Sequence, residues 1–294
     1  MLSRKSRADG GLALLAALAL GLYLVFLVLP LLLSLRGSFT NENPLRATNE
    51  FVGLRNYREM AGDDQLRASL VFTLTLAVGV TLAANALGVA FALLLNRTRL
   101  SYRVMRTLAF LPQVLSGVIV GFVWQTILTQ DGLLNNVLMS VGLLDEPYPW
   151  LGTPRAALFS IGAVVTWVLS GFTTVVYLAA LQSVPIELND MATMDGVRGT
   201  QRFRQVTWPM IAPGTTISVT ISLITVLKLY DIIAVLTGGG PANSTQSTAL
   251  YIVRLAFTSD RLGYASAVAM LLLALSAVLA LAVTGALRRR EVSL

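Results

Sequence analysis

The sequence predicts an all-α polytopic membrane protein with six transmembrane helices and with both termini in the cytoplasm. Three observations support this fold class: the composition, the presence of long apolar runs, and the distribution of basic residues. Of the 294 residues, 55% are hydrophobic and only 13% are charged, whereas soluble domains carry roughly 25% charged residues. The mean hydropathy is +0.72. A chain of this composition is a membrane protein.

Each expected span covers the roughly 20 residues needed to cross about 30 Å of hydrocarbon. We expect helices because backbone amides in lipid must pair within their own segment. The first run is too long for a signal-peptide core and no small-residue cleavage site follows it, so we expect it to be retained. The expected spans, within one membrane domain over 1–294, are 11–35, 68–95, 107–130, 156–184, 209–236 and 262–287. A short helix outside the bilayer is expected within 132–144.

The basic residues indicate the orientation. With both termini inside, the cytoplasmic segments hold 13 basic residues and 5 acids, and the outer segments hold 8 basic residues and 9 acids. This difference follows the positive-inside rule and indicates a multi-pass protein of the bacterial cytoplasmic membrane. A nucleic-acid partner is not expected, because the arginines are scattered over four separate inner segments.

Missing residue types exclude several kinds of chemistry. The chain has no cysteine and no histidine, which excludes a disulfide framework, a thiolate nucleophile and a Cys/His metal site. Its two lysines, Lys5 and Lys228, do not lie in a GxxxxGK[ST] loop, so the chain has no P-loop for ATP. We expect no metal and no cofactor on this chain.

A charged segment, 185–208, separates the fourth and fifth expected spans. Leu188, Met191, Ala192 and Asp195 are spaced i, i+3, i+4 and i+7, which places them on one helical face. Gly196 then interrupts the period, and a second helical stretch leads to Pro209, which is expected to begin the next span. The segment is therefore either a positive-inside loop on lipid headgroups or a helix-turn-helix finger for another protein's cleft. Its acids, which an anionic leaflet would repel, favour the finger.

The segment "NDMATMDGVRGTQRFRQVTWP" resembles the EAA loop of binding-protein-dependent ABC importer permeases. The shared pattern is Asp190-Met191-Ala192, then Asp195-Gly196, nine residues, and Val206 through Pro209. Three residues differ from the usual EAA loop: Asp190 replaces a Glu, Met191 replaces the first Ala, and Val197 replaces a further Ala. "FVGLRNY", "GLLNNVL", "YLAALQSVPIEL" and "LTGGGPANSTQSTALY" look like the carbohydrate-uptake branch, the maltose- and glycerol-phosphate-type sugar permeases.

The resemblance implies a type I ABC importer permease fold and a non-catalytic subunit that imports a di- or oligosaccharide or related polyol. It also implies a second homologous permease, two ATP-binding subunits that carry ATP and Mg, and an extracytoplasmic solute-binding protein. The segment would be a coupling helix inserted into a groove of the ATPase. The expected coupling residues are Glu187, Asp190, Met191, Ala192, Asp195, Gly196, Phe203 and Pro209.

Polar residues within the expected spans are candidates for a substrate path. Lys228 and Asp231 lie three apart on one side of the fifth helix. Three interpretations are open for this pair. The two side chains line the substrate path, or they form a structural ion pair, or Lys228 extends to the aqueous phase at the outer membrane boundary. Sugars require directional hydrogen bonds and flat apolar faces, which amides and indoles supply, although amides also hold membrane helices together. The path candidates are Asn85, Trp124, Gln125, Lys228 and Asp231, with Gln113 and Trp167 as further possibilities.

The run Gly238, Gly239, Gly240 and Pro241 ends the fifth expected span. A phosphate-binding reading is weak because no strand precedes the run. In the family that the chain resembles, this turn faces the binding protein, so a docking role is expected.

Two rival functions come from other classes. A secondary transporter or channel would use the Lys228 and Asp231 pair, but Asp231 is the only acid within an expected span, and proton-coupled transporters concentrate such groups. A polytopic enzyme is suggested by "DGVRG", which is similar to the start of a CDP-alcohol phosphotransferase signature. After Asp195, however, no further aspartate follows before Asp231, so a metal-binding array is lacking.

Overall fold

The computed structural model describes residues 15–45, 49–97, 99–185, 187–188, 191, 194, 196–289 and 291. The ordered elements among these residues are helices, and the extended pairing consists of one isolated bridge between Thr40 and Phe51. The all-α prediction is therefore confirmed. Among the described residues, five helices are long and apolar enough to cross a membrane, and a bent helix pair makes a sixth candidate if it is counted as one span.

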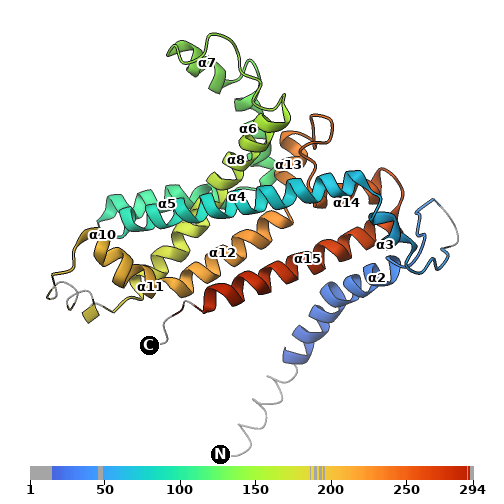
Figure 1. Cartoon of the computed structure of the whole chain (residues 1–294), viewed down its shortest axis with the longest axis horizontal. Helices are drawn as coiled ribbons and strands as arrows, with labels where there is room; N and C mark the ends of the chain where they lie inside the picture. The colour runs from blue at the N-terminus through green and yellow to red at the C-terminus, as the bar shows by residue number, and fades with distance from the viewer. Residues whose placement is uncertain are drawn as a thin grey trace, which may run out of the picture. The chain divides into compact units, whose positions relative to one another are not determined.

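The helices are seen in Figure 1. Three candidate spans are single helices: α4 (Asp64–Leu95), α8 (Pro154–Gln182) and α15 (Leu262–Arg288). The span Leu15–Gly37 includes η1 (Leu24–Val28) and α2 (Leu29–Gly37). The span Gly117–Ser140 joins α6 (Gly117–Leu128) to α7 (Leu133–Ser140). The bent pair joins Gly199–Met210 to α12 (Ala212–Leu227) at 70°. The other elements are α3 (Arg55–Met60), α5 (Leu100–Val114), α10 (Gly199–Arg202), η2 (Phe203–Thr207), α11 (Trp208–Met210), α13 (Asp231–Leu236) and α14 (Thr248–Phe257).

The chain forms two compact units. The first comprises Met1–Asp63 and Ile252–Leu273, and the second comprises Asp64–Tyr251 and Ala274–Leu294. The expected functional residues all belong to the second unit.

The third expected span, 107–130, is divided into two helices. α5 ends at Val114, Leu115 and Ser116 have extended backbones with ψ of 143° and 137°, and α6 begins at Gly117. Pro112 lies within the last turn of α5, where it removes a backbone donor and disfavours continuation of the helix. The third expected span is thus two helices separated by a complete break at Leu115 and Ser116.

The fifth expected span, 209–236, also differs from the prediction. Pro209 belongs to α11, and the long helix begins only at Ala212, after Ile211 has left helical geometry with φ −88° and ψ 5°. Pro213 occupies the first turn of α12, where a missing amide hydrogen is tolerated. α12 ends at Leu227, and α13 does not begin until Asp231.

In the second unit, α8 packs against α4, α5 and α12. Small residues allow the close approach, since a β-carbon on Gly88 of α4 would overlap the side chain of Thr173 of α8. The Thr173 hydroxyl donates a hydrogen bond of 2.8 Å to the carbonyl oxygen of Ala84 on α4. Close packing of this kind replaces the hydrophobic driving force that lipid does not provide. Around these contacts lies the apolar core, which includes Leu76, Val80, Ile161, Val164 and Val226.

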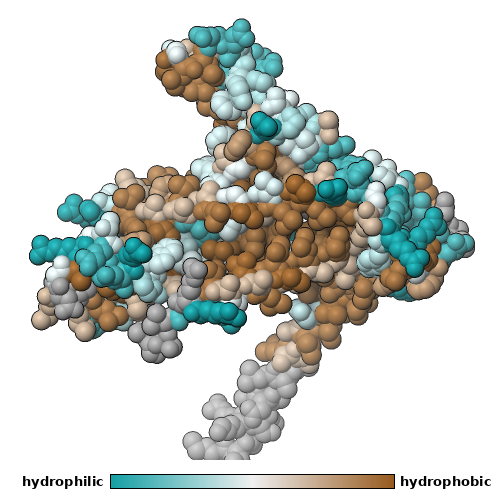
Figure 2. All heavy atoms as spheres, viewed as in Figure 1, coloured by the Kyte–Doolittle hydropathy of each residue, from teal (hydrophilic) through white to brown (hydrophobic). Residues whose placement is uncertain are grey.

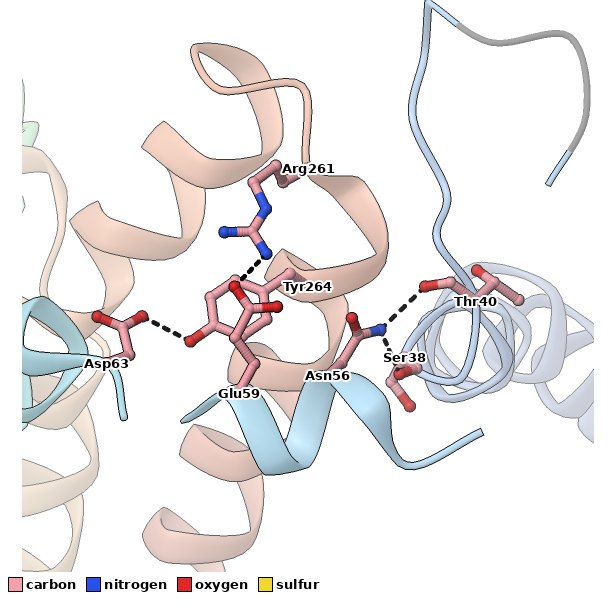
Figure 3. A network of polar contacts seen from close by, with 7 residues as sticks. All are labelled: Ser38, Thr40, Asn56, Glu59, Asp63, Arg261 and Tyr264. Carbon is pink, nitrogen blue, oxygen red and sulfur yellow. Dashed lines mark hydrogen bonds and ion pairs between the residues drawn. The ribbon is translucent and has the colours of Figure 1, made fainter. Parts of the chain in front are cut away.

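In the first unit, a polar network ties the segment after α2 to the start of α15 (Figure 3). The buried Asn56 amide donates to the carbonyl oxygens of Ser38 and Thr40 at 2.8 and 2.9 Å. Arg261 pairs with Glu59 at 2.5 Å. Because both partners of this ion pair are more than 40% exposed, the buried Asn56 contributes more to stability than the ion pair does.

Candidate functional site: the charged segment and a junction of two broken helices

The first half of the charged segment is helical where it is described. Glu187, Met191 and Met194 have helical geometry. Met191 is 60% exposed and Met194 is 87% exposed. Being three residues apart, the two methionines share one helical face. The structure therefore presents an uncovered apolar face at this point.

Glycines shape the turn that follows. Gly196 has φ +74°, and Gly199, which begins α10, has φ +55°. A β-carbon on Gly196 would meet no described atom within 4 Å. Gly196 is thus required for its left-handed backbone and not for close packing. Three further residues expected to couple, Asp190, Ala192 and Asp195, lie outside the described residues.

The second half of the segment lies beside a hollow that helices α4 and α8 also line. The ring of Phe203 packs against the ring of Trp208, with centroids 5.8 Å apart. Phe203 also lines a hollow of about 650 Å³, which includes Leu93 of α4 and Leu181 of α8. Phe203 and Pro209 are half-buried, whereas Met191 and Met194 are exposed.

Two broken helices meet at Gly117 and Asp231. Asp231 begins α13, and its carboxylate accepts a hydrogen bond of 2.9 Å from the amide of Ile232. The same carboxylate packs against Gly117, the first residue of α6. One turn farther along, Gly121 packs against Val235. The negative charge therefore lies beside the N-termini of two helices, where their dipoles stabilise it.

Lys228 does not pair with Asp231. No ion pair within 4.0 Å joins these two described residues. Lys228 is exposed at the C-terminal end of α12. The structural ion pair considered above is therefore contradicted, while the path-lining and snorkelling alternatives stay open.

Asn85 connects helices. Its side-chain amide donates a hydrogen bond of 2.8 Å to the carbonyl oxygen of Thr81, and its side-chain oxygen accepts a hydrogen bond of 3.0 Å from the Tyr177 hydroxyl. Both Asn85 and Tyr177 are buried between α4 and α8. The helix-packing alternative is thus favoured for Asn85.

The remaining path candidates are dispersed. The rings of Trp124 and Trp167 meet edge to face, with centroids 5.5 Å apart. Trp124 lines an apolar hollow of about 720 Å³, and Gln125 lines a separate hollow of about 430 Å³. The side-chain oxygen of Gln113 is buried without a hydrogen-bond partner. The path candidates therefore do not form one site in this conformation.

The glycine turn is held firmly by threonines. Gly238 and Gly239 have φ values of +56° and +83°. The amide of Gly239 donates to the Thr237 hydroxyl at 3.2 Å, and the Thr245 hydroxyl donates to the carbonyl oxygen of Gly240 at 2.5 Å. Farther along, the backbone amide of Thr248 donates a hydrogen bond of 2.9 Å to the hydroxyl of Thr73 on α4. The turn is a defined surface and not a loose loop.

Sequence reasoning missed Gly117 and Tyr177. A signal for Gly117 was available, because "GVIVG" places Gly117 and Gly121 four apart, the spacing of close helix contacts in membranes. Tyr177 gave no local signal, since its partner Asn85 lies 92 positions away.

Comparison with known proteins identifies the family. Residues 84–292 match the family described as "Binding-protein-dependent transport system inner membrane component". The chain belongs to this family. It is therefore a non-catalytic membrane component of an importer, which excludes the enzyme alternative and disfavours the gradient-driven one.

Two relatives illustrate the similarity. A probable starch degradation products transport system permease, AmyD, of Thermoanaerobacterium thermosulfurigenes is 30% identical over 271 residues, covering 92% of this chain and 91% of that one. The trehalose/maltose transport system permease MalF of Thermococcus litoralis is 32% identical over 241 residues, covering 82% of this chain and 80% of that one.

The fold is also shared with solved structures. A chain of a bacterial ABC transporter involved in the import of the acidic polysaccharide alginate has a TM-score of 0.84 at 24% identity, with 98% of each chain covered. A chain of the alginate transporter in complex with its pentasaccharide-bound periplasmic protein has a TM-score of 0.80 at 23% identity, covering 97% of this chain and 94% of that one. The chain thus has the type I ABC permease fold.

Proposed function

We propose that the chain is the transmembrane subunit of an ATP-driven importer for a di- or oligosaccharide or a related polyol. Relatives named for starch degradation products and for trehalose and maltose support a sugar substrate. In this proposal the chain crosses the bacterial cytoplasmic membrane six times, with both termini in the cytoplasm. The bent pair counts as the fifth span, and α5 with α6 as the third.

The uncovered face of Met191 and Met194 carries the proposal. A large apolar side chain in a charged, water-facing segment costs free energy unless a partner covers it. The proposed partner is the cytoplasmic ATPase subunit, whose groove receives the helix that contains Glu187 and Met191. Gly196 turns the chain back, and Phe203 transmits the displacement to the ends of α4 and α8. Closure of the ATPase dimer would then move the bundle between inward-open and outward-open states.

The proposed assembly contains two permeases, two ATPase subunits and a solute-binding protein. ATP and Mg bind the ATPase subunits, and no cofactor is assigned to this chain. The structurally similar alginate transporter has been solved in complex with a periplasmic protein, which supports the binding protein as a partner. The glycine turn 238–241 is the proposed docking element.

The junction at Gly117 and Asp231 is the proposed part of the substrate path. Helix breaks at membrane depth are tolerated where the backbone is buried or lines an aqueous cavity. Discontinuous helices commonly form the binding sites of transporters. In this proposal the junction changes its packing as the path opens, and Lys228 reaches the aqueous side of the path.

Cysteine crosslinking tests the proposal directly, because the chain has no cysteine of its own. Met194→Cys is introduced into the full transporter together with a single cysteine in the ATPase groove. We expect a crosslink whose yield changes when ATP and Mg are added. A cysteine at Leu133, which is 63% exposed on α7, is the control and should form no such crosslink. Exclusive labelling of Met194→Cys by lipid-phase probes would contradict the coupling role.

A further inference from the structure

A polar hollow lies within the first unit, where the segment after α2, the helix α3 and the start of α15 meet. Its volume is about 210 Å³, and its lining is mostly polar. In Figure 2 hydrophilic residues gather over α3, at the right of the view. The hollow is much larger than the space that one water molecule needs, and it is smaller than the roughly 300–1,000 Å³ of pockets for drug-sized ligands. We refer to it as the α3 hollow.

The buried Asn56 presents an unused acceptor to the α3 hollow. Asn56 is only 6% exposed, and its side-chain nitrogen donates hydrogen bonds to the carbonyl oxygens of Ser38 and Thr40. Its side-chain oxygen accepts no hydrogen bond from a described residue. In Figure 3 this oxygen points away from Ser38 and Thr40. Because a buried acceptor without a donor costs free energy, a ligand that donates a hydrogen bond here is favoured.

Two opposite charges line the α3 hollow without meeting. Arg55 is the first residue of α3, and Asp260 lies two residues before α15 begins. Neither side chain forms a hydrogen bond or an ion pair with a described residue. Asp260 has a φ of +52°, a left-handed conformation that Asp adopts more readily than most residues. The hollow therefore offers one unpaired donor group and one unpaired acceptor group.

The remaining wall of the α3 hollow is held in place by contacts of its own. The ion pair of Glu59 and Arg261 contributes one side of it. The Arg261 guanidinium also lies 4.5 Å from the centre of the Tyr264 ring. The Tyr264 hydroxyl donates a hydrogen bond to the carboxylate of Asp63 (Figure 3). A wall that is already ordered reduces the entropy that a ligand loses on binding.

The charges of the α3 hollow favour a neutral ligand with several hydroxyl groups. Two arginines and three acids, among them Glu42, line the hollow, so an anion meets an excess of acids. Among the described residues, no group of three His, Cys, Asp or Glu side chains could hold a metal ion. A hydroxyl group both donates and accepts. Neighbouring hydroxyls of one ring can therefore accept from Arg55 and donate to Asp260 and to the oxygen of Asn56.

We propose that the α3 hollow binds one ring of a sugar, or a polyol of similar size, at a subsite that shares no residue with the proposed substrate path. The inference rests on the proposed function, in which a sugar is the substrate and residues 38–63 lie outside the membrane. It extends that function by naming a second place on this chain that holds the sugar.

Saturation-transfer NMR on the whole transporter, reconstituted in nanodiscs without ATP, tests the subsite. The probes are glucose, maltose, trehalose and sorbitol. We expect the wild type to bind at least one of them. Arg55→Gln and Asp260→Asn should each weaken this binding about tenfold, because each removes a charge-assisted hydrogen bond. Asn is suited to the left-handed backbone at 260, so the substitution adds no strain.

Arg58→Gln is the matched control, because Arg58 is also exposed on α3 but does not line the hollow. It should bind the probes as the wild type does. Arg55→Lys keeps the charge but not the forked donor geometry, so its affinity should lie between those of the wild type and Arg55→Gln. Thermal unfolding of each variant, measured on the same preparation, reports whether the fold is retained.

Three results overturn the subsite. The first is a wild type that binds none of the four probes. The second is equal binding by the wild type, Arg55→Gln and Asp260→Asn. The third is displacement of the bound sugar by inorganic phosphate at the same concentration, because an anion then competes for the hollow.

Uptake into proteoliposomes separates the inference from the proposed function. A reconstituted wild type without ATP-driven uptake of any sugar contradicts the proposed function itself. A wild type that takes up a sugar, and whose binding of that sugar is the same in Arg55→Gln and Arg58→Gln, contradicts only the subsite.

Discussion

The carboxylate of Asp231 occupies the space in which a β-carbon of Gly117 would lie. Each residue begins a helix after a break, since Gly117 starts α6 and Asp231 starts α13. A β-carbon at 117 would therefore force the Asp231 carboxylate to move from its place beside the first residue of α6. The contact makes the junction sensitive to one added methyl group.

Gly117→Ala should destabilise the protein by about 1 kcal/mol, the lower end of the usual range for overpacking, because the carboxylate of Asp231 can rotate away. Thermal unfolding of the purified protein and uptake into proteoliposomes both measure the effect. In the Gly117→Ala background, Asp231→Ala should restore part of the stability, because it removes the overlapping carboxylate. Gly79→Ala is the control, since a β-carbon there meets no atom within 4 Å. An equal effect of Gly79→Ala and Gly117→Ala would show that the junction is not tightly packed.

Tyr177→Phe should destabilise the protein by about 1–3 kcal/mol, because it leaves the side-chain oxygen of Asn85 buried without a donor. The sugar concentration at half-maximal uptake should stay the same, since Asn85 connects α4 to α8. Unfolding and uptake are measured on the same preparation. A shift in sugar preference without a loss of stability would instead indicate that Asn85 lines the substrate path.

Substitutions at Gly196 should separate backbone geometry from charge. The φ of +74° is tolerated by Asn and Asp far better than by Val. Gly196→Asn should retain most of the transport, Gly196→Val should lose most of it, and Gly196→Asp should abolish it by adding a charge at the ATPase contact while the protein stays inserted. ATP-dependent uptake and membrane content are the measurements. Normal uptake by Gly196→Asp counts heavily against the coupling role.

Lys228→Met and Asp231→Asn should have independent effects, because no ion pair joins the two side chains. A double-mutant cycle on unfolding should give a coupling free energy below about 0.5 kcal/mol, the usual limit for independent sites. Coupling above about 1 kcal/mol would instead indicate an ion pair. Transport activity of the single variants shows which of the two residues belongs to the path.

Gly263→Ala should destabilise the first unit, because a β-carbon there would overlap the carbonyl oxygen of Thr40 and lie 2.9 Å from the amide nitrogen of Glu42. Backbone atoms cannot rotate away as a side chain can, so a loss of about 1–3 kcal/mol is expected. Gly285→Ala, on the same helix with no atom within 4 Å, should raise stability by about 0.5–1 kcal/mol. Proteolysis between residues 38 and 63 reports on the first unit. Similar behaviour of both variants would contradict the close packing at Gly263.

The local features of this chain could be read from its sequence. Long apolar runs are required by the thickness of the hydrocarbon, so α4, α8 and α15 were predicted close to their observed bounds. The break in the helical period at Gly196 was predicted as well, because a glycine in a polar helical pattern is a local signal. The family loop was recognisable for the same reason, since its residues are contiguous.

The tertiary structure alone decided which polar residues meet. It placed Asp231 against Gly117 and away from Lys228, and it joined Asn85 to Tyr177 across 92 positions. It also divided two expected spans into shorter helices. The physical reason is that a break or a buried polar group is stable only if a neighbour satisfies its hydrogen bonds or fills its space. Those neighbours come from distant parts of the chain, which a local pattern does not record.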